Sequence, residues 1–368
     1  MADTISFARG APSLDIVDVD GLRAAAQQVF EEDAAGATAY GTAVGYAPLR
    51  AWIAERHQVA PERVLVTNGS MQADAFLFDA LVKAGDAVIV ERPTYDRTLL
   101  SLRNRGADVR MVELEPDGID VSAVERVVAA GAGVKLAHII PNFQNPAGYT
   151  LSGEKRERLL ELARRHGFTV FEDDPYVSLR FEGAPLATML SMDPENVVYA
   201  SSFSKTVCPG IRVGYLVGSE ELIARIVKIA TSTYISPNMV AQAIVYRFCR
   251  SGALERSIET VKAALRDRAR TLCDALRAHI PDARFVEPEG GYFLWVELPR
   301  GTDVGALFTA AAERGVQFVK GTDFVLEGSE NCLRLAYSGV TTEQIEEGVE
   351  RLAEAYEEVR SGVSAGAA

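Results

Sequence analysis

The chain is poor in cysteine, histidine and lysine. Its four cysteines, at positions 208, 249, 273 and 332, are far apart and form no CxxC pair, so we expect reduced thiols in or near the core and no disulfide framework. The four histidines have no HxxxH or HExxH spacing, and we expect no metal site. Only 7 of the 38 basic residues are lysines, which makes a lysine in an unusual setting easy to notice.

Long apolar runs are also missing. No run approaches the roughly 20 residues of a membrane span. Residues 1–6 have neither the basic nor the apolar region of a secretory signal, so we expect a cytoplasmic protein. The formal net charge is −13. A diffuse negative field repels phosphate backbones and anionic lipids, so nucleic acid and membranes are not expected partners.

With 368 residues, the chain is long for one core and predicts two domains. Short apolar strands at 63–66, 87–90, 135–140, 168–171 and 197–200 alternate with helices such as 71–82 and 154–166. This alternation predicts an α/β domain with a buried, mostly parallel sheet. A long helix at 255–279, strands at 292–298 and 333–335, and helices at 304–314 and 342–360 predict a smaller α+β domain. Residues 361–368 read as a disordered tail.

Ligands in such sheets bind beyond the carboxyl ends of the strands, and five of these ends carry polar segments. Ser202-Phe203-Ser204-Lys205 follows one strand. A lysine there can form a Schiff base with an aldehyde cofactor, although the segment alone equally allows a surface lysine. Asp173 ends another strand. Its carboxylate could keep a pyridine nitrogen protonated, but Asp-Asp-Pro is also a common turn.

Other segments suit a phosphate and an aromatic ring. Ser70 opens a helix directly after a strand, which makes either an anion site or a simple N-cap. Asn145 could donate to a phenolate oxygen or belong to an Asn-Pro turn, and Tyr95 could stack on a ring or fill the core. Arg212 could pair with a phosphate. Arg334 lies in the apolar run Leu-Arg-Leu; if buried it needs an anion such as a substrate carboxylate, and otherwise it faces solvent.

Taken together, the order and spacing of these motifs resemble the class I/II aminotransferases of pyridoxal-phosphate (PLP) fold type I. The closest resemblance is to the group of 2-aminoadipate aminotransferases and the aminotransferase-like half of GntR-type regulators. It covers about residues 6–355. The matching blocks are Tyr40, 45–50, 67–72, 93–95, 141–148, 173–176, 202–205 with Arg212, 290–295 and 333–335.

The resemblance implies an α/β fold with a mostly parallel seven-stranded sheet in a large PLP-binding domain, residues 34–250, and a smaller α+β domain formed by residues 1–33 and 251–368. It implies pyridoxal 5'-phosphate as cofactor and a homodimer with active sites shared across the interface. Lys205 would carry the cofactor and shuttle a proton, and Asp173 would face the ring nitrogen. The other implied ligands are Asn145 and Tyr176 at the ring hydroxyl, Tyr95 on the ring, Ser70, Met71, Gln72, Ser202, Ser204 and Arg212 at the phosphate, Tyr40 at the partner's phosphate and Arg334 at the substrate carboxylate.

The chain departs from the family pattern near its start. Arg9-Gly10 stands where relatives often have two glycines, and the following segment lacks a common Phe-Pro. Arg9 could contact an acidic or carbonyl-bearing substrate, or it could be an exposed arginine. Since these positions set specificity, 2-aminoadipate is not carried over as the substrate.

We therefore expect an aminotransferase that moves an amino group from an α-amino acid to a 2-oxo acid, such as 2-oxoglutarate, by a ping-pong Schiff-base mechanism. The alternative is a PLP-dependent lyase, cyclase or decarboxylase on the same fold, because one cofactor serves all these reactions. A non-enzymatic sensor related to the regulators is a third reading, and a basic winged-helix segment before the matching region would support it.

Overall fold

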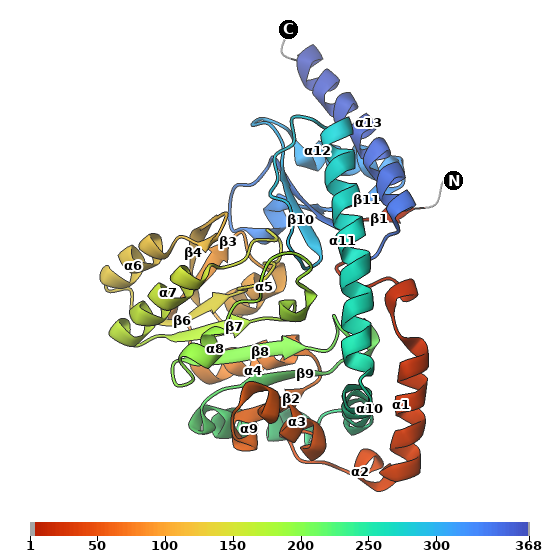
Figure 1. The fold of residues 1–368 in the computed structure, drawn as a ribbon. Helices are drawn as coiled ribbons and strands as arrows, with labels where there is room; N and C mark the ends of the chain where they lie inside the picture. The colour runs from red at the N-terminus through yellow and green to blue at the C-terminus, as the bar shows by residue number, and fades with distance from the viewer. Residues whose placement is uncertain (1–3, 367–368) are drawn as a thin grey trace.

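A large twisted sheet forms the centre of the computed structural model, which describes residues 4–366 (Figure 1). Its strand order is β2-β9-β8-β7-β6-β3-β4-β5. In chain order the strands are β2 (Val64–Thr67), β3 (Ala87–Arg92), β4 (Asp108–Glu115), β5 (Gly118–Ile119), β6 (Val134–Ile139), β7 (Thr169–Asp173), β8 (Val197–Ser202) and β9 (Gly214–Val217).

The sheet is mostly parallel, as predicted. The strands β8, β7, β6, β3 and β4 run parallel to one another, whereas β9 is antiparallel to both β8 and β2. The two-residue β5 pairs antiparallel with the end of β4, so the sheet has eight strands where seven were predicted. Two residues carry no hydrophobic alternation, which is why the sequence pattern does not reveal β5.

Helices cover both faces of this sheet, and the central strands are therefore buried almost throughout. Local sequence sets the helix ends: the Ser152 side chain accepts a hydrogen bond from the backbone of Lys155 at the start of α7, and Gly167 in a left-handed conformation ends it. The helices of this part are α3 (Ala47–His57), α4 (Ser70–Leu81), α5 (Asp96–Asn104), α6 (Val121–Ala129), α7 (Gly153–His166), α8 (Met189–Met192), α9 (Glu220–Tyr234) and α10 (Met239–Arg250).

A smaller α+β part lies beside the carboxyl ends of the central strands. Its antiparallel sheet has the order β10 (Phe293–Glu297), β13 (Cys332–Ala336), β12 (Val319–Lys320), and β1 (Ile5–Ser6) pairs with β11 (Val316–Gln317). The helices are α11 (Ala253–His279), α12 (Val304–Glu313) and α13 (Thr342–Gly366). The predicted tail is wrong from 361 to 366, because α13 continues through these residues; 367–368 lie outside the described residues.

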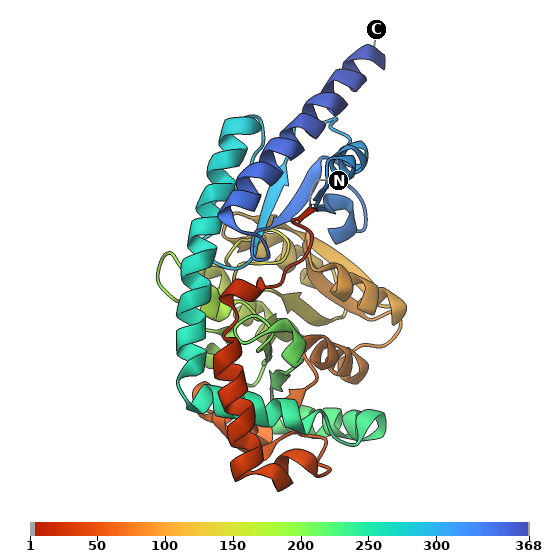
Figure 2. The same ribbon diagram turned by 90° about the vertical axis from the view of Figure 1, so that its right-hand side faces the viewer.

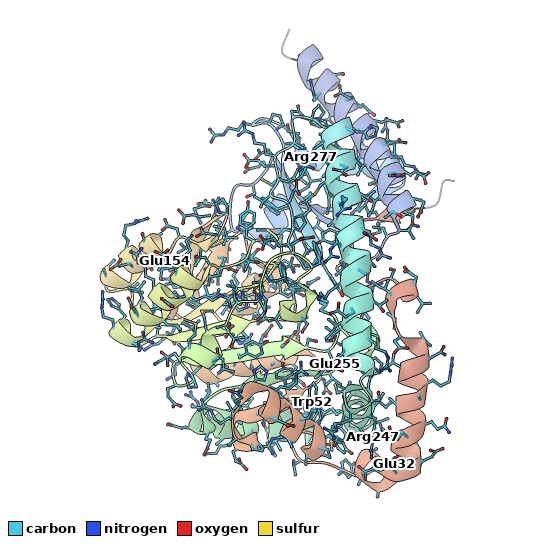
Figure 3. All side chains as sticks on the ribbon, in the orientation of Figure 1. Glu32, Trp52, Glu154, Arg247, Glu255 and Arg277 are labelled. Carbon is cyan, nitrogen blue, oxygen red and sulfur yellow. The ribbon has the colours of Figure 1, made fainter. Side chains whose placement is uncertain are left out.

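The long helix α11 passes beside both parts, and the N-terminal segment runs along it (Figures 1 and 2). Ile5, Phe7 and Ile16 belong to the apolar cluster of the smaller part. The next helix, α1 (Val19–Glu32), packs instead on α10, with α2 (Ala34–Thr38) beside it. Arg247 and Glu32 form an ion pair of 2.8 Å between α10 and α1 (Figure 3).

The predicted division into domains stays a proposal. We propose two domains with the large one centred on the eight-stranded sheet. The packing of α1 on α10 favours a boundary just before α1 instead of after residue 33. No helix between residues 4 and 366 combines the length and the apolar character that a membrane span requires.

Candidate active site

A cavity of about 630 Å³ opens between the carboxyl ends of the central strands and the sheet of the smaller part. Most of the residues singled out from the sequence line it, although they come from distant segments. These are Arg9, Ser70, Met71, Tyr95, Asn145, Asp173, Tyr176, Ser202, Ser204, Lys205, Arg212 and Arg334. The parallel strands bring the polar loops to one edge, as the sequence predicted.

Lys205 follows β8 and points into this cavity. Its Nζ donates a hydrogen bond of 2.7 Å to the carbonyl oxygen of Gly10 and lies 5.5 Å from the centre of the Tyr176 ring. Burial first, and then the positive charges of Arg334 and Arg212, lower the pKa of Lys205 to about 8. About a tenth of this amine is therefore unprotonated and nucleophilic at pH 7.

Asp173 ends β7 at the floor of the cavity. Its Oδ2 lies 3.3 Å from Nε2 of the fully buried His138 on β6. Since a carboxylate can only accept, Nε2 carries the hydrogen of this bond. The other oxygen, Oδ1, is buried and has no hydrogen-bond partner among the described residues. A buried carboxylate oxygen of this kind is suited to a protonated nitrogen of a ligand.

The start of α4 and the loop after β8 form a cradle of small and cationic groups. Arg212 Nη1 donates to Ser204 Oγ at 3.0 Å, and Ser70 begins the helix with free backbone N–H groups. Gly69 has φ +86°, and a Cβ there would lie 2.1 Å from an Arg212 nitrogen. A Cβ on Gly214 would lie 2.5 Å from the backbone nitrogen of Ser70. The close packing here holds the Arg212 guanidinium beside the N-terminus of α4, and this combination of donors is suited to an anion.

Arg334 lies on β13 at the opposite wall, 6% exposed. Its Nη1 donates to Asn145 Oδ1 at 2.9 Å and its Nη2 to the carbonyl oxygen of Ala8 at 2.6 Å. Its guanidinium carbon lies 4.4 Å from the centre of the Phe293 ring and 4.9 Å from that of Phe324. No carboxylate pairs with it among the described side chains. A buried guanidinium held by neutral groups is suited to an incoming carboxylate.

Two tyrosines stand beside these charged groups. Tyr176 is buried, and its ring centre lies 5.8 Å from that of Phe293. Burial raises the pKa of Tyr176 well above its usual value and that of Tyr95 to about 12. Both phenols therefore remain protonated at neutral pH and can donate hydrogen bonds.

Two of the residues proposed from the sequence do not line this cavity. The side chain of Gln72 accepts a hydrogen bond of 2.9 Å from the backbone of Asn68 and braces the turn before α4. Tyr40 is 88% exposed, away from the chain's own site. Arg9 lines the cavity and is exposed.

The structure also reveals polar residues that the sequence analysis missed. His138 lies inside an apolar strand pattern, Asp74 lies inside an apolar helix, and Tyr292 donates to the carbonyl oxygen of Lys205 at 2.8 Å. The signal for the first two was a polar residue at a core position of a regular element. Such a residue needs a partner or a function.

These groups fit pyridoxal 5'-phosphate. The free Asp173 oxygen suits the ring nitrogen, the cradle at Ser70 and Arg212 suits the phosphate, and the Lys205 amine suits the aldehyde. The protein would hold the ring at both ends and leave the reacting carbon beside Lys205.

Comparisons with known proteins identify the family of this chain. The profile of the aminotransferase class I and II family matches residues 2–352. The 2-aminoadipate transaminase of Thermus thermophilus is 35% identical over 95% of this chain and 89% of its own length. The aromatic-amino-acid aminotransferase 1 of Thermococcus litoralis is 33% identical over 97% of this chain and 89% of its own length.

Solved structures share the whole fold. The crystal structure of the α-aminoadipate aminotransferase LysN from Thermus thermophilus, in complex with N-(5'-phosphopyridoxyl)-L-leucine, has a TM-score of 0.93 at 33% identity and covers 97% of this chain and 93% of that chain. The resemblance seen in the sequence is thereby confirmed. The chain belongs to the class I and II aminotransferases and is a pyridoxal-phosphate-dependent aminotransferase.

Proposed function

We propose that this aminotransferase moves an amino group from an α-amino acid to a 2-oxo acid, with 2-oxoglutarate as the acceptor, by a ping-pong route. The observation that carries the proposal is the pairing of two cations in one cavity. Lys205 is a half-buried amine with a pKa of about 8, and Arg334 is a buried guanidinium without a carboxylate partner among the described side chains. An amino acid offers a carboxylate that would pair with Arg334 and an amine that would replace Lys205 on the cofactor aldehyde.

Lys205 and Asp173 would be the two residues that take part directly in the chemistry. Pyridoxal phosphate supplies an aldehyde that bonds to amines and a ring that withdraws electrons from the substrate α-carbon. Lys205 would hold the cofactor and then, once displaced by the substrate amine, carry a proton from the α-carbon to the cofactor carbon. Asp173 would hold a proton on the ring nitrogen, with His138 fixing its carboxylate from behind.

The remaining residues would position the cofactor and the substrate. Asn145 accepts from Arg334 through Oδ1, so its NH₂ group would donate to the ring hydroxyl oxygen, as would Tyr176. Tyr95 would pack on the ring. The phosphate ligands would be Ser70, the backbone N–H of Met71, Ser202, Ser204 and Arg212. Gln72 would support the turn before α4 instead of contacting the phosphate directly.

Arg9 is proposed to bind the second carboxylate of a dicarboxylic substrate. It lines the cavity on the side where Ala8 and Gly10 meet Arg334 and Lys205. Arg9→Ala should raise KM for 2-oxoglutarate and leave KM for pyruvate, which has no second carboxylate, nearly unchanged. Equal KM changes for both acceptors would contradict this role.

We also propose a homodimer with shared sites, and a cytoplasmic location stays a prediction from the sequence. Tyr40, after α2, is 88% exposed, and Leu14, before α1, is 77% exposed; large apolar side chains as exposed as these support contact with a second subunit. Analytical ultracentrifugation should give a dimer. Tyr40→Phe should lower cofactor affinity without dissociating the dimer, since only a hydroxyl would be missing from the neighbouring phosphate site.

A lyase, cyclase or decarboxylase is the alternative, and the spectrum of the holoenzyme separates it from a transaminase. Single amino acids are added while the visible absorbance is followed. We expect the visible absorbance band of the bound cofactor to bleach and to return when a 2-oxo acid is added. Release of pyruvate, ammonia or carbon dioxide without lasting bleaching would favour the alternative.

The role of Lys205 has its own test. Lys205→Ala should abolish turnover and leave the fold intact. Lys228→Ala, which replaces an exposed lysine on α9, should keep the activity of the wild type. A fully active Lys205→Ala variant would refute the mechanism.

A further inference from the structure

Asp74 is an acidic residue inside the apolar helix α4, one turn after Ser70. Residues four apart lie on the same helix face, so Asp74 faces the cavity that Ser70 enters, and it contributes to the lining. It is 7% exposed, and its Oδ1 has no hydrogen-bond partner among the described residues. Neighbouring helix positions such as Ala73, Phe76 and Leu77 are apolar and buried. An apolar side chain would pack better than an acid at this position, so packing does not explain Asp74.

Asp173 is the charged residue that influences the ionisation of Asp74. Burial, and then the charge of Asp173, raise the pKa of Asp74 well above its usual value. Both carboxyl groups line the same cavity, and each has one buried oxygen without a partner among the described residues. Two buried carboxylates that repel each other retain a proton between them.

The other ionisable groups around this pair act on Asp173 and form no ion pair with Asp74 among the described side chains. Tyr95, just before α5, has its phenol pKa raised by burial and by nearby acids that include both aspartates. His138 contacts Asp173 from β6. The cationic lining comes from Arg9, Arg97, Lys205, Arg212 and Arg334, with Asp96 and Asp323 as further acids. None of these cations forms an ion pair with Asp74 among the described side chains.

We propose that Asp74 is a second acidic residue of the subsite for the cofactor's ring nitrogen, sharing one proton with Asp173 before the cofactor binds and giving it up when the ring nitrogen binds. The inference rests on the proposed role of Asp173. Asp74 lies one helical turn from the helix start that would take the phosphate, and it lines the same cavity as the carboxylate that would face the ring nitrogen. Asp74 would act through Asp173, because the proton that the two share sets the charge of the subsite.

The protons can be counted for each state. Before binding, the pair holds one proton and one negative charge. When the ring binds in its unprotonated form, the carboxyl O–H bond breaks and an N–H bond forms on the ring nitrogen, so no proton enters from solvent. In Asp74→Asn the subsite has lost the carboxyl that shares this proton and has none to give. The same ring must then take one proton from solvent.

The experiment measures proton exchange on binding of pyridoxamine 5'-phosphate to the apoenzyme. This probe has the ring and the phosphate but no aldehyde, so it forms no bond to Lys205. Calorimetry in two buffers of different ionisation enthalpy gives the number of protons exchanged. At pH 7, Asp74→Asn should take up about one proton more per bound ligand than the wild type. Asp79→Asn, on the exposed side of the same helix and paired with Arg105, should match the wild type.

Two further variants keep the outcomes distinct. Asp74→Leu should show the same extra proton as Asp74→Asn, because neither side chain can hold one. Identical proton counts for wild type and Asp74→Asn would overturn the inference. Asp173→Asn tests the underlying role: it should weaken binding of the probe at least tenfold. Unchanged binding in that variant would refute the role of Asp173, whereas weakened binding with equal proton counts would refute only the role of Asp74.

Discussion

The amine of Lys205 donates a hydrogen bond to the carbonyl oxygen of Gly10 at 2.7 Å, which ties the N-terminal segment to the loop after β8. Arg334 makes the matching contact to the carbonyl oxygen of Ala8 at 2.6 Å. Two backbone carbonyl groups of one short segment thus accept from the two cations that would bind the cofactor and the substrate. A ligand that binds these cations would compete with the carbonyl oxygens for N–H donors, so we expect the position of this segment to respond to ligand binding.

The lowered pKa of Lys205 predicts how the apoenzyme combines with pyridoxal phosphate. Only the unprotonated amine attacks an aldehyde. Because burial lowers the pKa of Lys205 to about 8, the protonated form dominates below pH 8 and the unprotonated form above it. The rate of cofactor capture, followed by visible absorbance in a stopped-flow instrument, should therefore rise with pH through a midpoint of about 8 and then level off.

A variant of Arg334 tests whether neighbouring positive charge sets this midpoint. Arg334 is one of the cations that lower the pKa of Lys205, so Arg334→Gln should move the midpoint to higher pH. Arg110→Gln, an exposed arginine on β4, should not move it. A rate that keeps rising to pH 10 in the wild type would show that the lysine is not perturbed.

Gly214 predicts a selective loss of phosphate binding. A Cβ at this position would lie 2.5 Å from the backbone nitrogen of Ser70, and the turn before α4 would have to shift. Gly214→Ala should weaken binding of pyridoxal 5'-phosphate about tenfold or more, since each 1.4 kcal/mol of lost interaction is a factor of ten. Binding of pyridoxal, which has no phosphate, should change less. Gly210→Ala, where a Cβ meets nothing within 4 Å, is the matched control, and equal losses for both ligands would contradict the assignment.

Much of this site could be predicted from the sequence because its parts follow strands. A short apolar strand is visible in the sequence, and the residues after it must lie at the sheet edge. Lys205, Asp173 and Asn145 were found in this way, and the structure places all three in one cavity. The family resemblance then supplied roles that no single motif could supply.

The remaining features depend on packing that no local pattern encodes. Whether Arg334 faces solvent or the core was open in the sequence, and the rings of Phe293 and Phe324 decide it in the structure. Gln72 has the right place for a phosphate ligand, but the backbone of Asn68 takes its side chain. His138 and Asp74 are polar residues within apolar segments. The hydrophobic pattern identifies the segment as buried but does not indicate a role for a single polar residue inside it.

Replacement of Arg334 should affect substrate binding more than turnover. Arg334→Lys keeps the charge, but it loses the planar pair of donors and the packing between Phe293 and Phe324. We expect KM for the amino acid to rise about tenfold to a hundredfold, equivalent to roughly 1.4–2.8 kcal/mol, with a smaller change in kcat. Steady-state kinetics measure both constants. An unchanged KM would mean that another group binds the substrate carboxylate.

The last prediction concerns stability and Glu91, a buried acid on β3. Its Oε2 accepts hydrogen bonds from the backbone of Ile140 at 3.1 Å and from Gln144 at 3.0 Å. Burial raises the pKa of Glu91 from 4.5 to about 8, although these hydrogen bonds oppose the shift. The folded state therefore binds a proton that the unfolded state releases between pH 4.5 and 8. The stability contributed by Glu91 is fully present below pH 4.5 and is lost as the pH rises through 8.

Glu91→Gln removes this titration and keeps an oxygen that accepts both hydrogen bonds. The free energy of unfolding of the wild-type holoenzyme should fall relative to this variant by about 1 kcal/mol per pH unit between roughly pH 5 and pH 8. Thermal or urea unfolding at several pH values measures the difference, and other buried acids such as Glu172 cancel because both proteins contain them. Glu161→Gln, at an exposed position of α7, should follow the wild type. A constant difference across this pH range would mean that Glu91 is ionised inside the folded protein, held by the donors at Ile140 and Gln144.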